Sequence, residues 1–322
     1  MRISAALPPG VTALLFDEAA KRRRCEEIAV AAFEERGFSE VVLPILDYFE
    51  PYEALLTPQL REELYRFVDR DGELLALRGD FTPMLARLLA PLLDSLELPL
   101  RLFYRGDLVR YQPERPGRLR EYYELGAELL GVSGEEADEE MLALFLRLLT
   151  GEGRSGVRVI LGFAGALDVL LKAAPTENRD GLARGVARRE RRVAAATSPS
   201  LLQVVEEGVP EDAEVLGEAA AQSLRSLEAL CTRVRARFDA EQVTLSIDLA
   251  EFAEDFIDPR LVETSARRPY YDGLVFRAYF EGGAQSIGRG GRYDRLFRRL
   301  DTDLGAVGFS ISVDPLLLGT AS

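Results

Sequence analysis

The stretch Arg105–Gly131, RGDLVRYQPERPGRLREYYELGAELLG, decides how this chain folds. Together with the residues just before it, its first part forms a largely apolar, alternating run that is typical of a strand. Pro113, Pro116 and Gly117 then interrupt the run with residues that sustain neither a helix nor a strand ladder. A second run of strand formers, YYELGAELLG, follows directly. The stretch therefore predicts two antiparallel strands joined by a charged loop.

Two acidic residues on the second of these strands form a candidate site. Glu124 and Glu128 are an even number of residues apart, so on a regular strand they share one face. Two carboxylates with a nearby arginine, such as Arg110, can form a socket for a small zwitterionic ligand that carries a positive charge. A solvated sheet face, on which arginine and glutamate side chains pair, would show the same spacing. The spacing alone does not decide between these interpretations.

The composition limits the classes of protein and of chemistry. The chain has 322 residues, of which 47% are hydrophobic and 29% are charged, which suits a globular protein of one large or two modest domains. A net charge of −14 argues against a general nucleic-acid surface, because phosphate binding depends on clustered cations. The sequence contains no histidine. A histidine general base, a Ser-His-Asp triad and imidazole metal ligands are therefore excluded.

Cysteine use and hydropathy exclude further classes. Cys25 and Cys231 are far apart in helical contexts, so neither a zinc site nor a disulfide framework is expected. The N-terminal MRISAALPPG lacks the apolar core of a signal peptide, and no apolar run reaches membrane-spanning length. We therefore expect a cytoplasmic protein with no metal, no cofactor and no membrane or nucleic-acid partner.

The N-terminal part predicts a long amphipathic helix followed by a strand. The helix has Asp17 as a candidate N-cap, an apolar stripe that includes Ile28 and Phe33, and Gly37 at its end. The segment EVVLPILDY that follows predicts a buried strand that is interrupted at Pro44.

A hairpin and a helix start come next. Alternating strands flank Asp71-Gly72, which is a strong hairpin signal. Thr82-Pro83 then opens a helix with proline in its first turn. Asp80 and Thr82 therefore lie at a strand-to-helix junction, where they either cap the helix or face a ligand.

The second half of the chain predicts a helical block between strands. Residues 164–240 have a polar helical pattern, and strand patterns return after them. Near the end, GRGG at 288–291 predicts a glycine-rich loop, and Asp314-Pro315 starts a helix after a buried strand. We expect one discontinuous α+β domain spanning 1–322. Its two parts are about 1–163 and 241–322, with a helical insertion at about 164–240.

Five motifs in order resemble the catalytic core of the histidyl-tRNA synthetases. They are LRGDFTP (77–83), RYQPERPGRLREYYELGAELLG (110–131), PYYDGLVF (269–276), GRGGRYDRL (288–296) and AVGFSISVD (306–314). The resemblance covers nearly the whole chain. It implies the class II synthetase fold, a mainly antiparallel six-stranded sheet flanked by helices, and a dimer formed through the first helix and strand.

Three positions depart from the synthetase pattern. Gln112 stands where the second motif has a glutamate, Pro315 where the third motif has the arginine that binds the ATP phosphates, and Ala266 where a catalytic arginine is expected. The sequence also ends shortly after the third motif, so we expect no anticodon-binding domain. The resemblance therefore does not imply amino-acid activation, which depends on fixed cations around a triphosphate.

The amino-acid pocket of the synthetases is retained in outline. By resemblance, Asp80 and Thr82 match the residues that hold the amino group of histidine, and Glu128 matches the glutamate that faces the imidazole. Glu124 stands where the synthetases have a glutamine. The residues implied for histidine binding are Asp80, Thr82, Arg110, Glu124, Glu128, Tyr270 and Tyr271.

The chain keeps the pocket residues but lacks the residues of the ATP site. In this combination it resembles the synthetase-like regulatory subunits of ATP phosphoribosyltransferase. That similarity implies a non-catalytic protein that partners a short-form catalytic subunit in the first step of histidine biosynthesis. It also implies histidine as the feedback effector, and a homodimer within a hetero-oligomer. Two alternatives stay open: a truncated synthetase-like enzyme that activates an amino acid with ATP, and an interaction module with an empty pocket.

Overall fold

The computed structural model describes residues 6–56, 58–112, 119–175, 178–253, 271–283 and 285–318. The chain divides into two compact units. Unit 1 comprises Met1–Glu128 and Ser310–Ser322, and unit 2 comprises Leu129–Phe309. The sequence predicted one discontinuous domain with a helical insertion at about 164–240. The boundaries of that insertion stay a prediction.

Within the described residues the main sheet has eight strands, in the order β1-β5-β6-β11-β10-β9-β7-β8. The predicted six-stranded, mainly antiparallel sheet is therefore wrong, because β1/β5 and β7/β8 are parallel pairs and make the sheet mixed. The strands at the two ends of the order, β1 and β8, are the ones that pair in parallel. The chain passes from β7 to β8 through helices, and such a crossover returns it in the same direction. The bounds are β1 (Ser39–Glu40), β5 (Leu100–Val109), β6 (Glu121–Leu130), β7 (Val157–Phe163), β8 (Val243–Ile247), β9 (Leu274–Phe280), β10 (Gly288–Arg292) and β11 (Ala306–Ser312).

Unit 1 begins with the predicted long helix, α1 (Asp17–Glu34). Phe16, not Asp17, occupies the N-cap position, and no side chain caps this helix end, so the predicted cap is wrong. The end of the helix is confirmed. Gly37 has a φ of 75° there, a conformation that glycine adopts without strain, and its N–H donates to the Glu34 carbonyl over 2.9 Å.

The strand predicted to follow α1 is split at Pro44 as expected, but it is not buried. β1 pairs with β5 in the main sheet, whereas β2 (Leu46–Tyr48) pairs with β4 in a separate small sheet. Val42, in the link between them, is 87% exposed. A strand that leaves one sheet for another lies at the edge of both, which explains its exposure.

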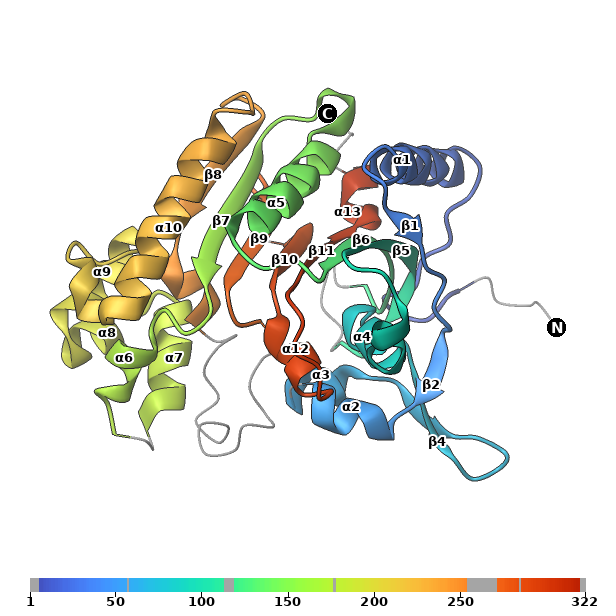
Figure 1. Ribbon diagram of the computed structural model, residues 1–322, viewed down its shortest axis with the longest axis horizontal. Helices are drawn as coiled ribbons and strands as arrows, with labels where there is room; N and C mark the ends of the chain where they lie inside the picture. Colours follow the sequence, from blue (N-terminus) through green and yellow to red (C-terminus); the bar gives the residue numbers. More distant parts are fainter. Residues whose placement is uncertain are drawn as a thin grey trace. The chain divides into compact units, whose positions relative to one another are not determined.

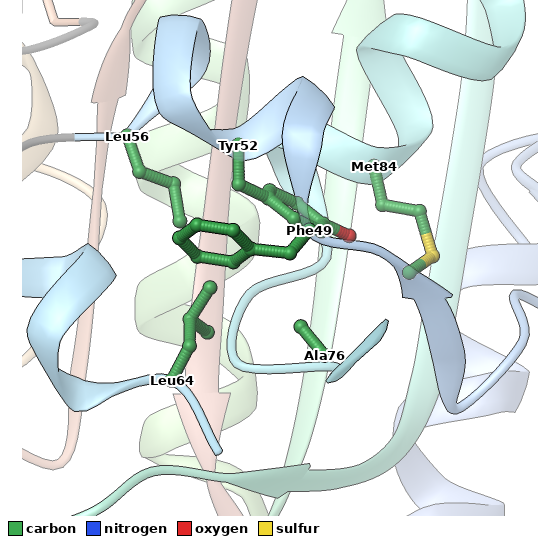
Figure 2. Packing of buried hydrophobic residues seen from close by; sticks show 6 residues of the cluster. All are labelled: Phe49, Tyr52, Leu56, Leu64, Ala76 and Met84. Atoms are coloured by element: carbon green, nitrogen blue, oxygen red, sulfur yellow. The ribbon is translucent and has the colours of Figure 1, made fainter. Parts of the chain in front are cut away.

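The small sheet of unit 1 has the order β2-β4-β3 and contains the hairpin predicted at Asp71-Gly72. Its inner face contributes Ala76 to a core cluster in which Phe49 and Tyr52, from the start of α2 and from α2 itself, meet Leu64 and Met84 (Figure 2). This cluster connects the small sheet to α4, the helix that carries Thr82. The remaining bounds in unit 1 are α2 (Glu50–Leu55), α3 (Pro58–Glu63), β3 (Arg66–Val68), β4 (Leu74–Leu77), α4 (Thr82–Leu89), η1 (Ala90–Ser95) and α13 (Val313–Leu318).

In unit 2 the predicted helical block lies together beside β7 and β8 (Figure 1). α5 (Glu135–Leu149) covers the sheet through Phe145, whose ring contacts those of Phe276 and Phe309 at 4.9 and 5.3 Å between centroids. The other bounds are η2 (Gly151–Gly153), α6 (Asp168–Lys172), α7 (Arg179–Ala187), α8 (Arg191–Thr197), α9 (Pro199–Glu207), η4 (Ala213–Leu216), α10 (Glu218–Arg235), η5 (Leu249–Phe252) and α12 (Asp294–Arg298).

The glycine-rich segment of unit 2 is a strand, β10, and not the predicted loop. Its glycines are needed for close packing. A Cβ on Gly290 would lie 2.5 Å from both the Gly308 carbonyl oxygen and the Phe276 ring. Glycine here therefore permits a close approach of neighbouring strands. Among the described residues, no helix is long and apolar enough to cross a membrane.

Candidate functional site

The candidate site of unit 1 is built from the start of α4 and from the two long strands of the predicted hairpin. α4 begins at Thr82 with Pro83 at its first turn, as the sequence predicted. β5 contributes Tyr104, and β6 contributes Glu124 and Glu128. Both glutamates are buried, with 7% and 1% of their surfaces exposed. A solvated sheet face is therefore excluded as the explanation of their spacing.

Glu128 is the centre of a buried hydrogen-bond network. Its Oε1 accepts from the Thr82 hydroxyl over 2.7 Å and from the Tyr104 hydroxyl over 3.2 Å. Hydroxyl groups that donate to a buried carboxylate favour its ionised form. Thr82 thus does not cap α4 with its side chain, which donates to Glu128 instead. Whether it faces a ligand stays a prediction.

Tyr104 is a site residue that sequence reasoning missed. It is 1% exposed, and its ring stacks on Phe81 with 4.3 Å between centroids. Burial, together with the nearby Glu128 charge, raises the pKa of Tyr104 well above its ordinary value. The hydroxyl therefore stays protonated and remains a donor. The sequence pattern placed Tyr104 in a strand because of its apolar ring. A buried tyrosine hydroxyl usually has a hydrogen-bond partner, and this was the available signal.

Asp80 and Arg110 form a second buried pair in the same unit. Arg110 Nη2 lies 3.2 Å from Asp80 Oδ2, and Arg110 Nε donates to the Gly79 carbonyl over 2.6 Å. The other oxygen of Asp80 accepts from the Thr82 backbone N–H over 3.1 Å. Asp80 thus supports the start of α4 and also fixes a buried guanidinium. Its predicted role in supporting the helix is confirmed, and its role in ligand binding stays a prediction.

Arg78 is a further buried residue that the sequence did not single out. Its guanidinium donates to the backbone carbonyls of Leu43, Pro44 and Asp107, and it lies 4.2 Å from the centre of the Phe81 ring. Burial lowers the pKa of Arg78. Two of these carbonyls lie between β1 and β2 and the third lies in β5. Arg78 therefore connects the β1–β2 link to β5 and holds the segment that precedes α4 in place.

Of the remaining predicted residues, some belong to unit 2 or to α13, and others lie outside the described residues. Tyr271 belongs to unit 2, where it packs against a cluster that includes Phe252 and Val275. Tyr270 and Ala266 lie outside the described residues. Pro315 is in α13, immediately after Asp314, whose carboxylate accepts from the Tyr123 backbone N–H over 2.8 Å.

Comparison with known proteins points to one family. A family model described as histidyl-tRNA synthetase matches residues 10–316. The chain is 30% identical to an ATP phosphoribosyltransferase regulatory subunit of Geobacter metallireducens, covering 98% of this chain and 74% of the relative. It is 33% identical to a protein of the same name from Symbiobacterium thermophilum, covering 97% of this chain and 79% of the relative.

Solved structures agree on the fold. An ATP phosphoribosyltransferase regulatory subunit/histidyl-tRNA synthetase from Bacillus halodurans C aligns with a TM-score of 0.81 at 24% identity, over 100% of this chain and 84% of that one. The apo histidyl-tRNA synthetase of S. aureus aligns with a TM-score of 0.61 at 17% identity, over 98% of this chain and 70% of that one. The fold is therefore that of the class II synthetases, as the motifs implied, although its sheet is larger than predicted.

Proposed function

This chain belongs to the histidyl-tRNA synthetase family, and from that premise we propose that it is a regulatory subunit of ATP phosphoribosyltransferase. The observation that carries the proposal is the similarity to relatives of that name over nearly the whole chain. In this role the chain is not a catalyst. It joins a short-form catalytic subunit in the first step of histidine biosynthesis and makes that step sensitive to histidine. A cytoplasmic location belongs to the same proposal.

The site of unit 1 supports a binding role. Asp80, Thr82, Arg110 and Glu128 are buried and hydrogen-bonded, so their polar groups are held in fixed positions, as recognition of a small polar ligand would need. Pro315 stands where the family motif has its phosphate-binding arginine, and a proline side chain has no charge to hold a triphosphate. Ligand recognition without amino-acid activation is the combination that a regulatory subunit needs.

The proposed ligand is histidine, whose three polar groups match the charged groups of the site. Asp80 would face the ammonium, Arg110 the carboxylate and Glu128 an imidazole N–H. Burying such a ligand is tolerable only when each charge is paired, since an orphaned buried charge costs several kcal/mol. Glu124, Thr82, Tyr270 and Tyr271 keep the binding roles that the family motifs imply.

Co-expression with a short-form catalytic subunit tests the proposal. A pull-down on the tagged chain is expected to retain the catalytic subunit, and the complex is expected to transfer a phosphoribosyl group to ATP in a reaction that histidine inhibits. The catalytic subunit alone is the control for both measurements. No retention, and an unchanged rate on adding this chain, would contradict the proposal.

A truncated synthetase-like enzyme is the alternative function. It would need a cation at the position of Pro315, and the substitution there favours the regulatory role. The purified chain is therefore expected to show no exchange of pyrophosphate into ATP in the presence of histidine. Exchange above the background of a protein-free reaction would favour the alternative.

We also propose that the chain forms an isologous homodimer through the region that contains α1, β1 and β2. The small sheet gives a physical reason for association. The cross-strand pairs Leu46↔Leu77, Tyr48↔Leu75 and Phe67↔Leu75 place five apolar side chains on its outer face. Leu46, Tyr48 and Phe67 are 45%, 56% and 41% exposed. Such a contiguous apolar face is typical of an interaction surface, and a second copy of the chain would cover it.

Analytical ultracentrifugation tests the dimer. The chain is expected to sediment as a dimer at micromolar concentration, and Leu46→Asp is expected to shift it toward the monomer. Leu92→Asp is the matched control, because Leu92 is 51% exposed in the same unit but lies in η1, away from the small sheet. A monomeric wild-type chain, or equal effects of the two substitutions, would contradict this assembly.

A further inference from the structure

The segment formed by α4, η1 and the residues just after them is apolar on its outer side as well as on its inner side. On the inner side, Leu85, Ala86 and Leu93 are buried. On the outer side, four leucines are 38%, 51%, 37% and 42% exposed; they are Leu88, Leu92, Leu96 and Leu98, and we call them the leucine face. A helix that is hydrophobic on all sides is normally covered, so the leucine face indicates an interaction surface.

The spacing of these leucines brings them together. Leu88, Leu92 and Leu96 recur every fourth residue, which is the spacing that places side chains on one side of a helix. η1 ends at Ser95, the backbone is extended at Leu96, and Leu98 follows two residues later. The leucine face is therefore confined to one short stretch, 88–98, within unit 1.

Two carboxylates lie among these leucines. Asp94 in η1 and Glu97 after it are both exposed. Neither carboxylate forms a hydrogen bond or an ion pair with another residue in the part of the chain that the structure describes. The Ser95 hydroxyl, by contrast, donates to the Leu92 carbonyl over 2.7 Å. The side chains between the leucines that remain for a partner are therefore acidic.

Charge decides which kind of partner fits the leucine face. This chain has a net charge of −14, so a second copy would bring mainly like charge toward Asp94 and Glu97, which disfavours association. A protein surface with apolar side chains and neighbouring lysine or arginine residues would match both the leucines and the carboxylates.

The leucine face also continues from a helix that belongs to the candidate site. α4 begins at Thr82, whose hydroxyl donates to Glu128, and it ends at Leu89, next to Leu88. A partner whose activity responds to a ligand of this site needs contact with an element that the ligand touches. A partner on the leucine face would have that contact through α4.

We propose that the leucine face is the surface on which the catalytic subunit of ATP phosphoribosyltransferase docks, through apolar side chains flanked by basic residues. This inference rests on the proposed function, because it takes the catalytic subunit as the partner. It adds the contact surface and its chemistry, and it separates that surface from the small sheet that we assign to the homodimer.

The affinity of the short-form catalytic subunit for the full-length chain, measured by biolayer interferometry, tests the inference. Leu92→Asp places a charge in the leucine face, so the dissociation constant should rise by at least about tenfold. Val169→Asp is the control: Val169 is 50% exposed but lies in α6 of unit 2, so the affinity should not change. Circular dichroism and sedimentation check that both variants keep the fold and the assembly of the wild type.

A charge-neutralising double variant, Asp94→Asn with Glu97→Gln, tests the basic character of the partner. Association with the wild-type chain should become slower as salt is added, because salt screens the attraction between the two surfaces. The double variant should associate more slowly at low salt and lose most of this salt dependence. Glu218→Gln with Glu228→Gln is the control, because it removes the same charge from exposed positions of α10 in unit 2.

The outcomes separate this inference from the function on which it rests. If the catalytic subunit binds Leu92→Asp as tightly as the wild type, the inference is overturned while the regulatory role stands. If Leu92→Asp converts the chain to a monomer, a second copy covers the leucine face, and the inference is overturned as well. If the catalytic subunit does not bind the wild-type chain at all, the proposed function itself fails, and the inference fails with it.

Discussion

Two buried regions of this protein differ in the kind of group that donates to their carboxylates. In unit 2, Arg292 donates to Asp138, Asp294 and the carbonyls of Val132 and Gly134, and its Nη2 also lies 2.7 Å from Asp138 Oδ1. In unit 1, Glu128 accepts from two neutral hydroxyl groups, those of Thr82 and Tyr104.

We expect this difference to separate a structural cluster from the proposed binding site. Arg292 joins β10 to the start of α5, and Asp294 also accepts from the Ala306 N–H over 2.8 Å, so these contacts fix one arrangement of three elements. The Glu128 network instead joins α4, β5 and β6 through hydroxyl groups, and the proposed histidine would add an N–H donor to it. Low exposure alone does not separate the two regions, because Arg292 and Glu128 are both less than a tenth exposed, whereas the donors to their carboxylates differ.

The largest expected effect is that of Arg292→Leu on stability. Removing one partner of a buried ion pair leaves Asp138 and Asp294 without their cation, and such changes cost about 3–5 kcal/mol. Chemical denaturation would measure the loss. Arg225→Leu is the matched control: its pair with Glu214 is exposed, so it should change the free energy of unfolding by less than about 1 kcal/mol.

The loss caused by Arg292→Leu should also depend on pH. Burial raises the pKa of Asp138, and the Arg292 charge opposes that rise. Without Arg292 the folded-state pKa rises further above its unfolded value of about 3.9. Stability is then lost as the pH rises through the folded-state pKa, so the deficit relative to wild type should be smaller near pH 4.5 than near pH 7. A deficit that is equal at both pH values would show that Asp138 is not left as an orphaned charge.

The next effect is that of Glu128→Gln on feedback. Hydrogen bonds to charged groups contribute roughly 1.5–3 kcal/mol, so the histidine concentration that half-inhibits the complex should rise by about tenfold or more. The measurement is a histidine titration of the reconstituted complex, with the rate expressed relative to the uninhibited rate of the same complex. An unchanged inhibition curve would mean that histidine acts outside this site.

The sequence predicted those parts of the site that depend on local periodicity. The strand period placed Glu124 and Glu128 on one face, and Thr82-Pro83 marked the start of α4; the structure confirms both. The contact between Asp80 and Arg110 depends on how residues 30 apart in sequence meet in space, which no local pattern encodes. Tyr104 was missed for a similar reason, because its partner Glu128 lies on another strand.

The sheet was predicted less well because its ends are set by tertiary contacts. β1 is two residues long, which is too short to show any periodicity. It is a strand because it pairs with the edge of β5. β10 was predicted as a loop because glycine is rare in strands. Its glycines are instead required by the close approach of Phe276 and Gly308. Local composition in this chain therefore predicts strand interiors well and edges and close contacts poorly.

The smallest expected effect is that of Tyr104→Phe, which removes one of the two hydroxyl groups that donate to Glu128. The substitution keeps the ring that stacks on Phe81, and Thr82 remains as a donor. We expect a loss of about 1.5 kcal/mol in the free energy of unfolding, at the low end for a hydrogen bond to a charged group. Because the pKa of Tyr104 is raised, the wild-type hydroxyl stays protonated, and the loss should be constant between about pH 6 and pH 9.

Histidine should offset part of the loss caused by Tyr104→Phe. A ligand N–H that reaches Glu128 takes the place of the missing hydroxyl donor, so saturating histidine should stabilise the variant more than it stabilises the wild type. Denaturation curves with and without histidine measure both quantities. A loss as large as that of Arg292→Leu, with no extra stabilisation by histidine, would mean that the Glu128 network is a structural cluster of the same kind as that of Arg292. A small loss that histidine offsets would show that the network is completed by its ligand, which is the property that distinguishes a binding site from a structural cluster.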